Sequence, residues 1–99
     1  MRTDFKAVNN AALVALPVLL GRWLPDGRKE GREWVVRNPR RHDRKPGSFK
    51  VNLETGQWAD FATGDKGGDV VSLAAFLCGL SQIEAARSLA EMLGVSSHE

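Results

Sequence analysis

The sequence predicts an α+β fold, in which an N-terminal helix and two C-terminal helices accompany a small antiparallel sheet of about three strands. Three observations predict it. Residues 48–53 alternate between apolar and polar side chains and precede a glycine-containing turn, as in a β-hairpin. Residues 82–93 repeat apolar side chains at helical spacing. Pro17 interrupts an apolar N-terminal stretch, as expected at the start of a helix.

The N-terminal part is predicted to contain two short helical pieces. Because proline disfavours helix in the residue before it, we expect one turn of helix at 11–15 and a second piece at 17–23. The predicted organisation is a partly helical segment over 1–17, one domain over 18–94 and a disordered tail over 95–99.

The C-terminal helices are predicted from their end signals. Asp69 is a good N-cap for a helix over 70–78, and Gly79 suits its C-terminal end. Ser81 opens a capping box, with an acid three residues later, at the start of a helix over 82–93.

Three β-runs make up the predicted sheet, at 34–37, 48–53 and 57–61. Residues 40–47 lack apolar side chains and are predicted to form a surface loop. The side chains expected to be mostly buried are Phe49, Val51, Leu53, Leu73, Leu77, Ile83, Leu89 and Leu93.

Charge is unevenly distributed along the chain. Residues 22–50 carry ten Lys and Arg against four Asp and Glu, whereas residues 51–99 carry two against seven. A basic block on an otherwise acidic domain is typical of nucleic-acid binders, although a solvated loop is the simpler alternative. The candidate contacts are Arg37, Arg40, Arg41, Arg44, Lys45, Lys50 and Trp58. For Trp58, packing in the core is favoured over stacking on a base.

Several function classes are disfavoured. A single cysteine excludes an internal disulfide, and the apolar stretch 11–20 is too short to span a bilayer, so we expect a cytoplasmic protein with no membrane contact. The acidic residues are scattered singly and do not predict the carboxylate cluster of a two-metal active site. The chain is therefore not expected to be an enzyme by itself.

The order of motifs resembles the CHC-type zinc ribbon of bacterial and phage DNA primases. The resemblance covers about residues 18–94. It depends on the following segments: Gly31 to Pro39, His42, Ser48-Phe49, Val51-Asn52, Gly56, Asp60-Phe61, Gly67-Gly68-Asp69-Val70, Glu84-Ala85-Ala86, Leu89-Ala90 and Leu93-Gly94.

The positions that hold zinc in that family carry different residues here. Asn38, His42, Asp60 and Thr63 stand where the family has Cys, His, Cys and Cys, with the histidine one residue late. Without thiolates a tetrahedral structural zinc site is not expected, so no cofactor is predicted. The candidates to replace the stabilising effect of zinc by packing are Trp34, Trp58, Phe61 and the two C-terminal helices.

The resemblance implies a non-catalytic module of a primase or primase-helicase that contacts single-stranded template DNA. A primase or helicase catalytic domain is then a possible partner. The alternative is a protein-interaction adaptor from a mobile element, which docks a primase or helicase and makes no nucleic-acid contact.

Overall fold

The computed structural model describes residues 2–36 and 49–98. Within these residues the chain forms four helices and five strands, which alternate in groups along the sequence. In chain order they are α1 (Phe5–Val14), α2 (Leu16–Trp23), β1 (Arg28–Glu30), β2 (Glu33–Val36), β3 (Phe49–Asn52), β4 (Trp58–Asp60), β5 (Lys66–Gly67), α3 (Val70–Cys78) and α4 (Gln82–Leu93). The α+β class predicted from the sequence is thus confirmed.

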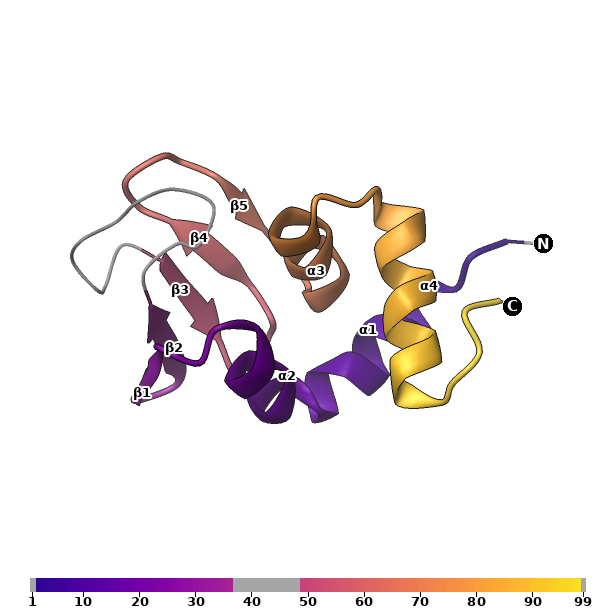
Figure 1. Ribbon diagram of the computed structural model, residues 1–99, viewed down its shortest axis with the longest axis horizontal. Helices are drawn as coiled ribbons and strands as arrows, with labels where there is room; N and C mark the ends of the chain where they lie inside the picture. The colour runs from indigo at the N-terminus through magenta and orange to yellow at the C-terminus, as the bar shows by residue number, and fades with distance from the viewer. Residues whose placement is uncertain (1, 37–48, 99) are drawn as a thin grey trace.

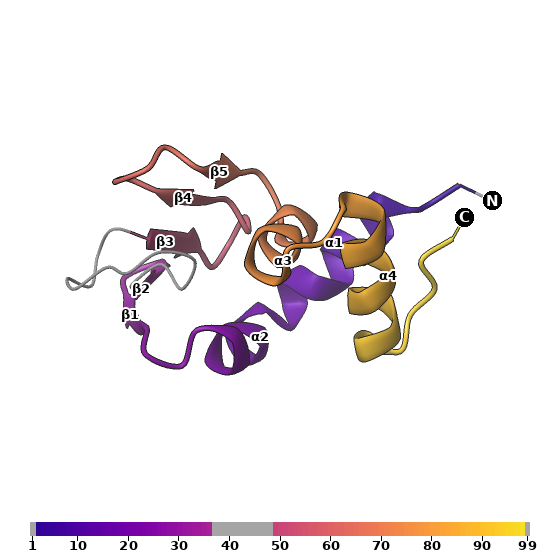
Figure 2. The same cartoon turned by 45° about the horizontal axis from the view of Figure 1, so that its top comes forward.

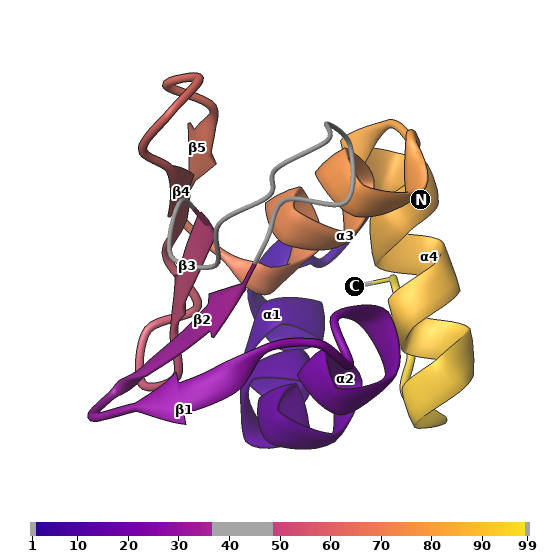
Figure 3. The same ribbon diagram turned by 60° about the vertical axis from the view of Figure 1, so that its left-hand side comes forward.

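The five strands form one antiparallel meander in the order β1-β2-β3-β4-β5. The sheet occupies one end of the molecule in Figure 1, and α3 lies between it and α4, as Figure 2 also shows. The helices all lie on the same side of the sheet (Figure 3). None of the four described helices covers the opposite face of the sheet, called the outer face below.

The prediction of about three strands was too low. Strand β1 was missed because its three residues are charged and exposed, so no apolar alternation marks it. It forms because Gly31, at φ +62°, permits a two-residue turn that pairs Glu30 with Glu33. Strand β5 was missed because it is only a Lys-Gly pair, held by its pairing with β4.

The N-terminal helix is longer than the turn predicted at 11–15. It begins at Phe5 because the Asp4 side chain accepts the Ala7 N–H at 3.0 Å, a cap that replaces a missing helical partner. The Asn9 side chain also accepts the Val71 N–H at 2.9 Å, which fixes α1 against the start of α3.

The C-terminal helices match the predicted bounds. Asp69 and Ser72 form a reciprocal capping box at the start of α3, and Ser81 and Glu84 form another at the start of α4. Hydrogen bonds from the backbone and hydroxyl of Ser81 hold the pKa of the Glu84 carboxyl below its ordinary value.

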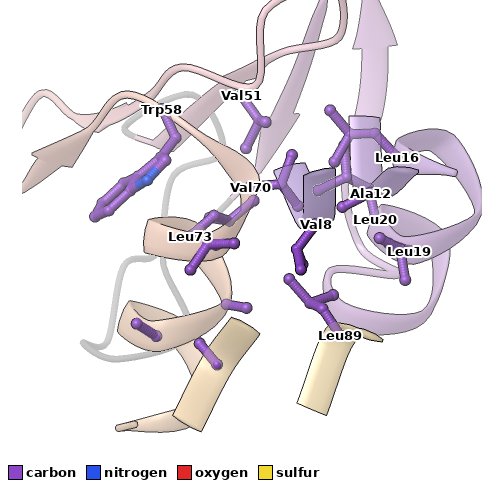
Figure 4. Packing of buried hydrophobic residues seen from close by; sticks show 14 of the residues in the cluster. Val8, Ala12, Leu16, Leu19, Leu20, Val51, Trp58, Val70, Leu73 and Leu89 are labelled. Atoms are coloured by element: carbon purple, nitrogen blue, oxygen red, sulfur yellow. The ribbon is translucent and has the colours of Figure 1, made fainter. Parts of the chain in front are cut away.

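One hydrophobic core joins the helices to the inner face of the sheet. Figure 4 shows Val51 and Trp58 of the sheet turned toward Val70 and Leu73 of α3, while Val8 of α1 lies beside them. The rings of Trp58 and Phe76 lie 4.7 Å apart between centroids, at a tilted angle that aromatic pairs favour.

Most of the predicted core positions are correct. Phe49, Val51, Leu73 and Leu89 are buried, and Leu53, Leu77 and Leu93 are partly buried against the core. The prediction that Ile83 is buried is wrong, because the residue is 47% exposed. The buried stripe of α4 instead consists of Ala85, Ala86, Leu89 and Ala90, since small side chains allow α3 and α4 to pack closely.

The two ends of the described chain lie together. Thr3 and His98 form an isolated antiparallel bridge, and the Asp4 N–H donates to the Ser97 carbonyl at 2.9 Å. The predicted division into 1–17, 18–94 and 95–99 remains a prediction. Among the described residues no single helix is long and apolar enough to cross a membrane, and the one helix pair that reaches that length and hydropathy together is bent by 105°.

Candidate nucleic-acid interface

A tight turn after β4 holds Asp60 and Thr63, two of the positions matched to zinc ligands from the sequence. The Asp60 carboxylate, 1% exposed, accepts the N–H groups of Ala62 at 2.9 Å and Thr63 at 3.4 Å. The Thr63 hydroxyl donates to the Asp65 carboxylate at 2.8 Å, and Gly64 adopts φ +86° to close the turn. Asp60 therefore stabilises the turn from within by hydrogen bonds to its backbone.

The outer face of the sheet carries a row of cations that crosses all five strands. The pairing registers align Arg28 with Val35, Val35 with Lys50, Lys50 with Ala59, and Ala59 with Lys66. Because neighbouring strands lie about 4.8 Å apart, alternate members of this row stand about 10 Å from each other. The row thus places Arg28, Lys50 and Lys66 on an apolar floor of Val35 and Ala59, with Arg28 ion-paired to Glu30 of its own strand at 2.9 Å.

An exposed aromatic ring lies beside the middle cation of that row. The Lys50 Nζ atom lies 5.7 Å from the centroid of the Phe61 ring, within cation–π range. Phe61 is 71% exposed. The predicted packing role of Phe61 was therefore wrong, because its side chain follows the outer face of the sheet and not the core.

A second row of polar groups lies one pleat away from the cations. Glu33 pairs with Asn52, and the Gln57 carbonyl accepts the Asn52 N–H at 2.7 Å, so the three side chains are neighbours across β2, β3 and the start of β4. Residues two apart along a strand are separated by about 7 Å. The outer face therefore presents an amide and carboxylate row, a cation row and then an aromatic ring.

These rows border an open hollow of about 580 Å³, a volume within the range of small-molecule sites. The polar and aromatic residues that line it are Glu33, Lys50, Asn52, Gln57, Phe61, Lys66 and the mostly buried Trp58. Ala59 and Gly67 contribute part of its floor. Its chemistry combines positive charge, amide groups and one ring face, which is the combination that single-strand binders use.

The predicted nucleic-acid contact residues lie in different parts of the structure or outside the described residues. Lys50 lies on the outer face, on β3. Trp58 is 6% exposed and its indole N–H donates to the Ser72 hydroxyl at 2.9 Å, so it packs in the core and offers no ring to a base. Five predicted cations and two former ligand positions lie outside the described residues: Arg37, Arg40, Arg41, Arg44, Lys45, Asn38 and His42.

Sequence reasoning missed the outer-face residues Arg28, Glu33, Phe61 and Lys66. Arg28 and Lys66 belong to the two strands that were not predicted. Their alignment with Lys50 depends on strand register, which alternation within a single strand does not give.

No family model matches the sequence, and no curated protein matches it. Among solved structures, the chain is similar to the Aquifex aeolicus primase, whose structure holds zinc-binding and RNA polymerase domains, with a TM-score of 0.78 and 24% sequence identity. The chain has the fold of a primase zinc-binding domain. The match covers 97% of this chain but only 23% of that primase.

The fold of that neighbour implies zinc, and the residues here do not fit it. At the two described positions, one carboxylate oxygen of Asp60 already accepts hydrogen bonds from backbone N–H groups. The Thr63 hydroxyl is a poor zinc ligand and donates a hydrogen bond to Asp65. Within residues 2–36 and 49–98, no three His, Cys, Asp or Glu side chains come close enough to hold a metal ion.

Proposed function

We propose that this chain is a non-catalytic, cytoplasmic module of a primase or primase-helicase system, and that it binds single-stranded template DNA. The observation that carries the proposal is the outer face of the sheet, where Lys50 lies against the exposed ring of Phe61 in a row of three cations. The similarity in fold to a primase zinc-binding domain supports the proposal that the chain belongs to a primase system.

The physical basis of binding is charge first and stacking second. Lys and Arg side chains neutralise phosphates, and an exposed aromatic ring accepts any base on its face. The basic segment that contains Arg40, Arg41 and Arg44 precedes β3 in the sequence and is proposed to supply further phosphate contacts. If about three phosphates are neutralised, the log-log salt dependence for a single strand has a slope of about −2.

Fluorescence anisotropy with a labelled oligonucleotide at several salt concentrations tests the proposal. Lys50→Ala with Phe61→Ala should weaken binding at least about fivefold and flatten the slope by about 0.7, since one phosphate contact and one stacking face are lost. The control is Phe5→Ala with Lys6→Ala, an adjacent aromatic and cation on α1, at the end of the molecule away from the sheet (Figure 1).

The basic segment is tested separately. Replacing Arg40, Arg41 and Arg44 together by Ala should flatten the salt slope and leave the melting temperature nearly unchanged, because the sequence predicts a surface loop there and charges in such a loop contribute little to folding. Unchanged affinity in both the sheet and the arginine variants would contradict the proposed interface.

The adaptor alternative has an observation of its own. Val14 and Val18 are 86% and 62% exposed, and they lie on either side of the break between α1 and α2. Exposed apolar side chains of this kind can contact a partner protein. Absence of single-strand binding by the wild-type chain at low salt would favour the adaptor over the nucleic-acid module.

A further inference from the structure

The hollow on the outer face has a directional arrangement of hydrogen-bonding groups at one end. The Asn52 Oδ1 atom accepts the N–H groups of Glu54 at 2.8 Å and Thr55 at 3.0 Å. These bonds fix the side-chain amide, so the amino group of Asn52 is the part left for a ligand. Asn52 is therefore a donor in the hollow.

An acceptor stands directly beside this donor. Glu33 is the cross-strand partner of Asn52, and its carboxylate can only accept hydrogen bonds when it is ionised. Among the described residues, the ion pairs are Arg28 with Glu30 and Arg32 with Glu54, and neither involves Glu33. Its two oxygens are thus available together to a group with two adjacent donors.

We propose, building on the proposed function, that this hollow binds a single-stranded dinucleotide step and selects guanine at the position of Glu33 and Asn52. The Watson–Crick edge of guanine presents one acceptor, O6, and then two adjacent donors, N1–H and the N2 amino group. The carboxylate of Glu33 takes the two donors as a bidentate, charge-assisted pair, and the amino group of Asn52 donates to O6. Cytosine, thymine and adenine lack two adjacent donors on that edge.

The other rows accommodate the rest of the step. Lys50 lies two residues from Asn52 along β3, about 7 Å, and takes the phosphate. Lys66 lies on β5, about 10 Å across the sheet from Lys50, and adds a second positive charge on that side. Phe61 lies beyond them and stacks the second base without selecting its identity. The volume of about 580 Å³ admits the guanine nucleotide while the second base rests on the exposed ring.

The arrangement also selects single strands. In a duplex the Watson–Crick edge of guanine is already paired, and its major-groove edge offers only the N7 and O6 acceptors. A carboxylate cannot accept from those atoms. Guanine can therefore present N1–H and the N2 amino group together to Glu33 only when it is unpaired.

The experiment compares three labelled oligothymidylates by anisotropy: one unmodified, one with a single central deoxyguanosine, and one with deoxyinosine there. Inosine keeps O6 and N1–H but lacks the N2 amino group. We expect the guanine oligonucleotide to bind about tenfold more tightly than the unmodified strand, with inosine between them. In Glu33→Gln, the ratio of the affinity for the guanine oligonucleotide to that for the unmodified strand should fall close to one. Binding of the unmodified strand should persist.

The matched control is Glu30→Gln, which removes one acidic charge from the neighbouring position in the same cross-strand row, outside the hollow. It should keep the tenfold preference. An equal affinity for all three strands, or a guanine preference that survives Glu33→Gln, overturns the guanine site while binding of oligothymidylate still supports the proposed function. Failure of all three strands to bind overturns the proposed function itself.

Discussion

Replacing Asp60 by Ala should destabilise the protein more than replacing Thr63, its neighbour in the turn after β4. The Asp60 carboxylate is 1% exposed and accepts two backbone N–H groups, at 2.9 and 3.4 Å. A hydrogen bond to a charged group contributes about 1.5–3 kcal/mol, and the longer bond adds only a fraction of this. The expected loss is therefore about 2–3 kcal/mol of unfolding free energy.

Thermal unfolding followed by circular dichroism measures this loss. For a domain of this size about 2–3 kcal/mol lowers the melting temperature by roughly 10–20 °C. Thr63→Ala is the control in the same turn: its hydroxyl bonds only to the exposed Asp65, so its loss should cost less than about 1 kcal/mol. A melting temperature for Asp60→Ala within about 3 °C of wild type would refute the idea that Asp60 holds the turn together.

Three further predictions concern the metal, the packing below the sheet and acid stability. Elemental analysis of protein purified without chelator should find no stoichiometric zinc, and a chelator should leave the melting temperature unchanged; chelator-induced melting would contradict this. Gly67→Ala should lower stability by about 1–3 kcal/mol in urea unfolding, because the added Cβ meets the indole of Trp58, whereas Gly68→Ala has open space and should be nearly neutral. The lowered pKa of Glu84 contributes stability that is present above its unfolded-state pKa and lost as pH falls through the lower folded-state value. Glu84→Gln should therefore reduce the dependence of the melting temperature on pH in the acid range, and an unchanged dependence would contradict the capping-box role.

The sequence by itself determined the elements whose signals are local. The caps at Asp69 and Ser81 placed α3 and α4 at their observed bounds, because a cap acts on N–H groups within three residues of it. Alternation in Phe49–Asn52 placed β3 with the correct face inward, because one face of the sheet meets the helical core.

The tertiary structure alone decided the remaining strands and the candidate site. Residues 28–30 and Lys66–Gly67 form strands only because neighbouring strands pair with them, and their own side chains carry no strand pattern. Trp58 and Phe61 are three residues apart, so strand alternation puts them on opposite faces, but only the packing of the helices decided that the face of Trp58 meets the core and that of Phe61 is exposed. The row of Arg28, Lys50 and Lys66, and the pairing of Glu33 with Asn52, exist only through the register of the sheet, because hydrogen bonds between strands bring together residues that are distant in the chain.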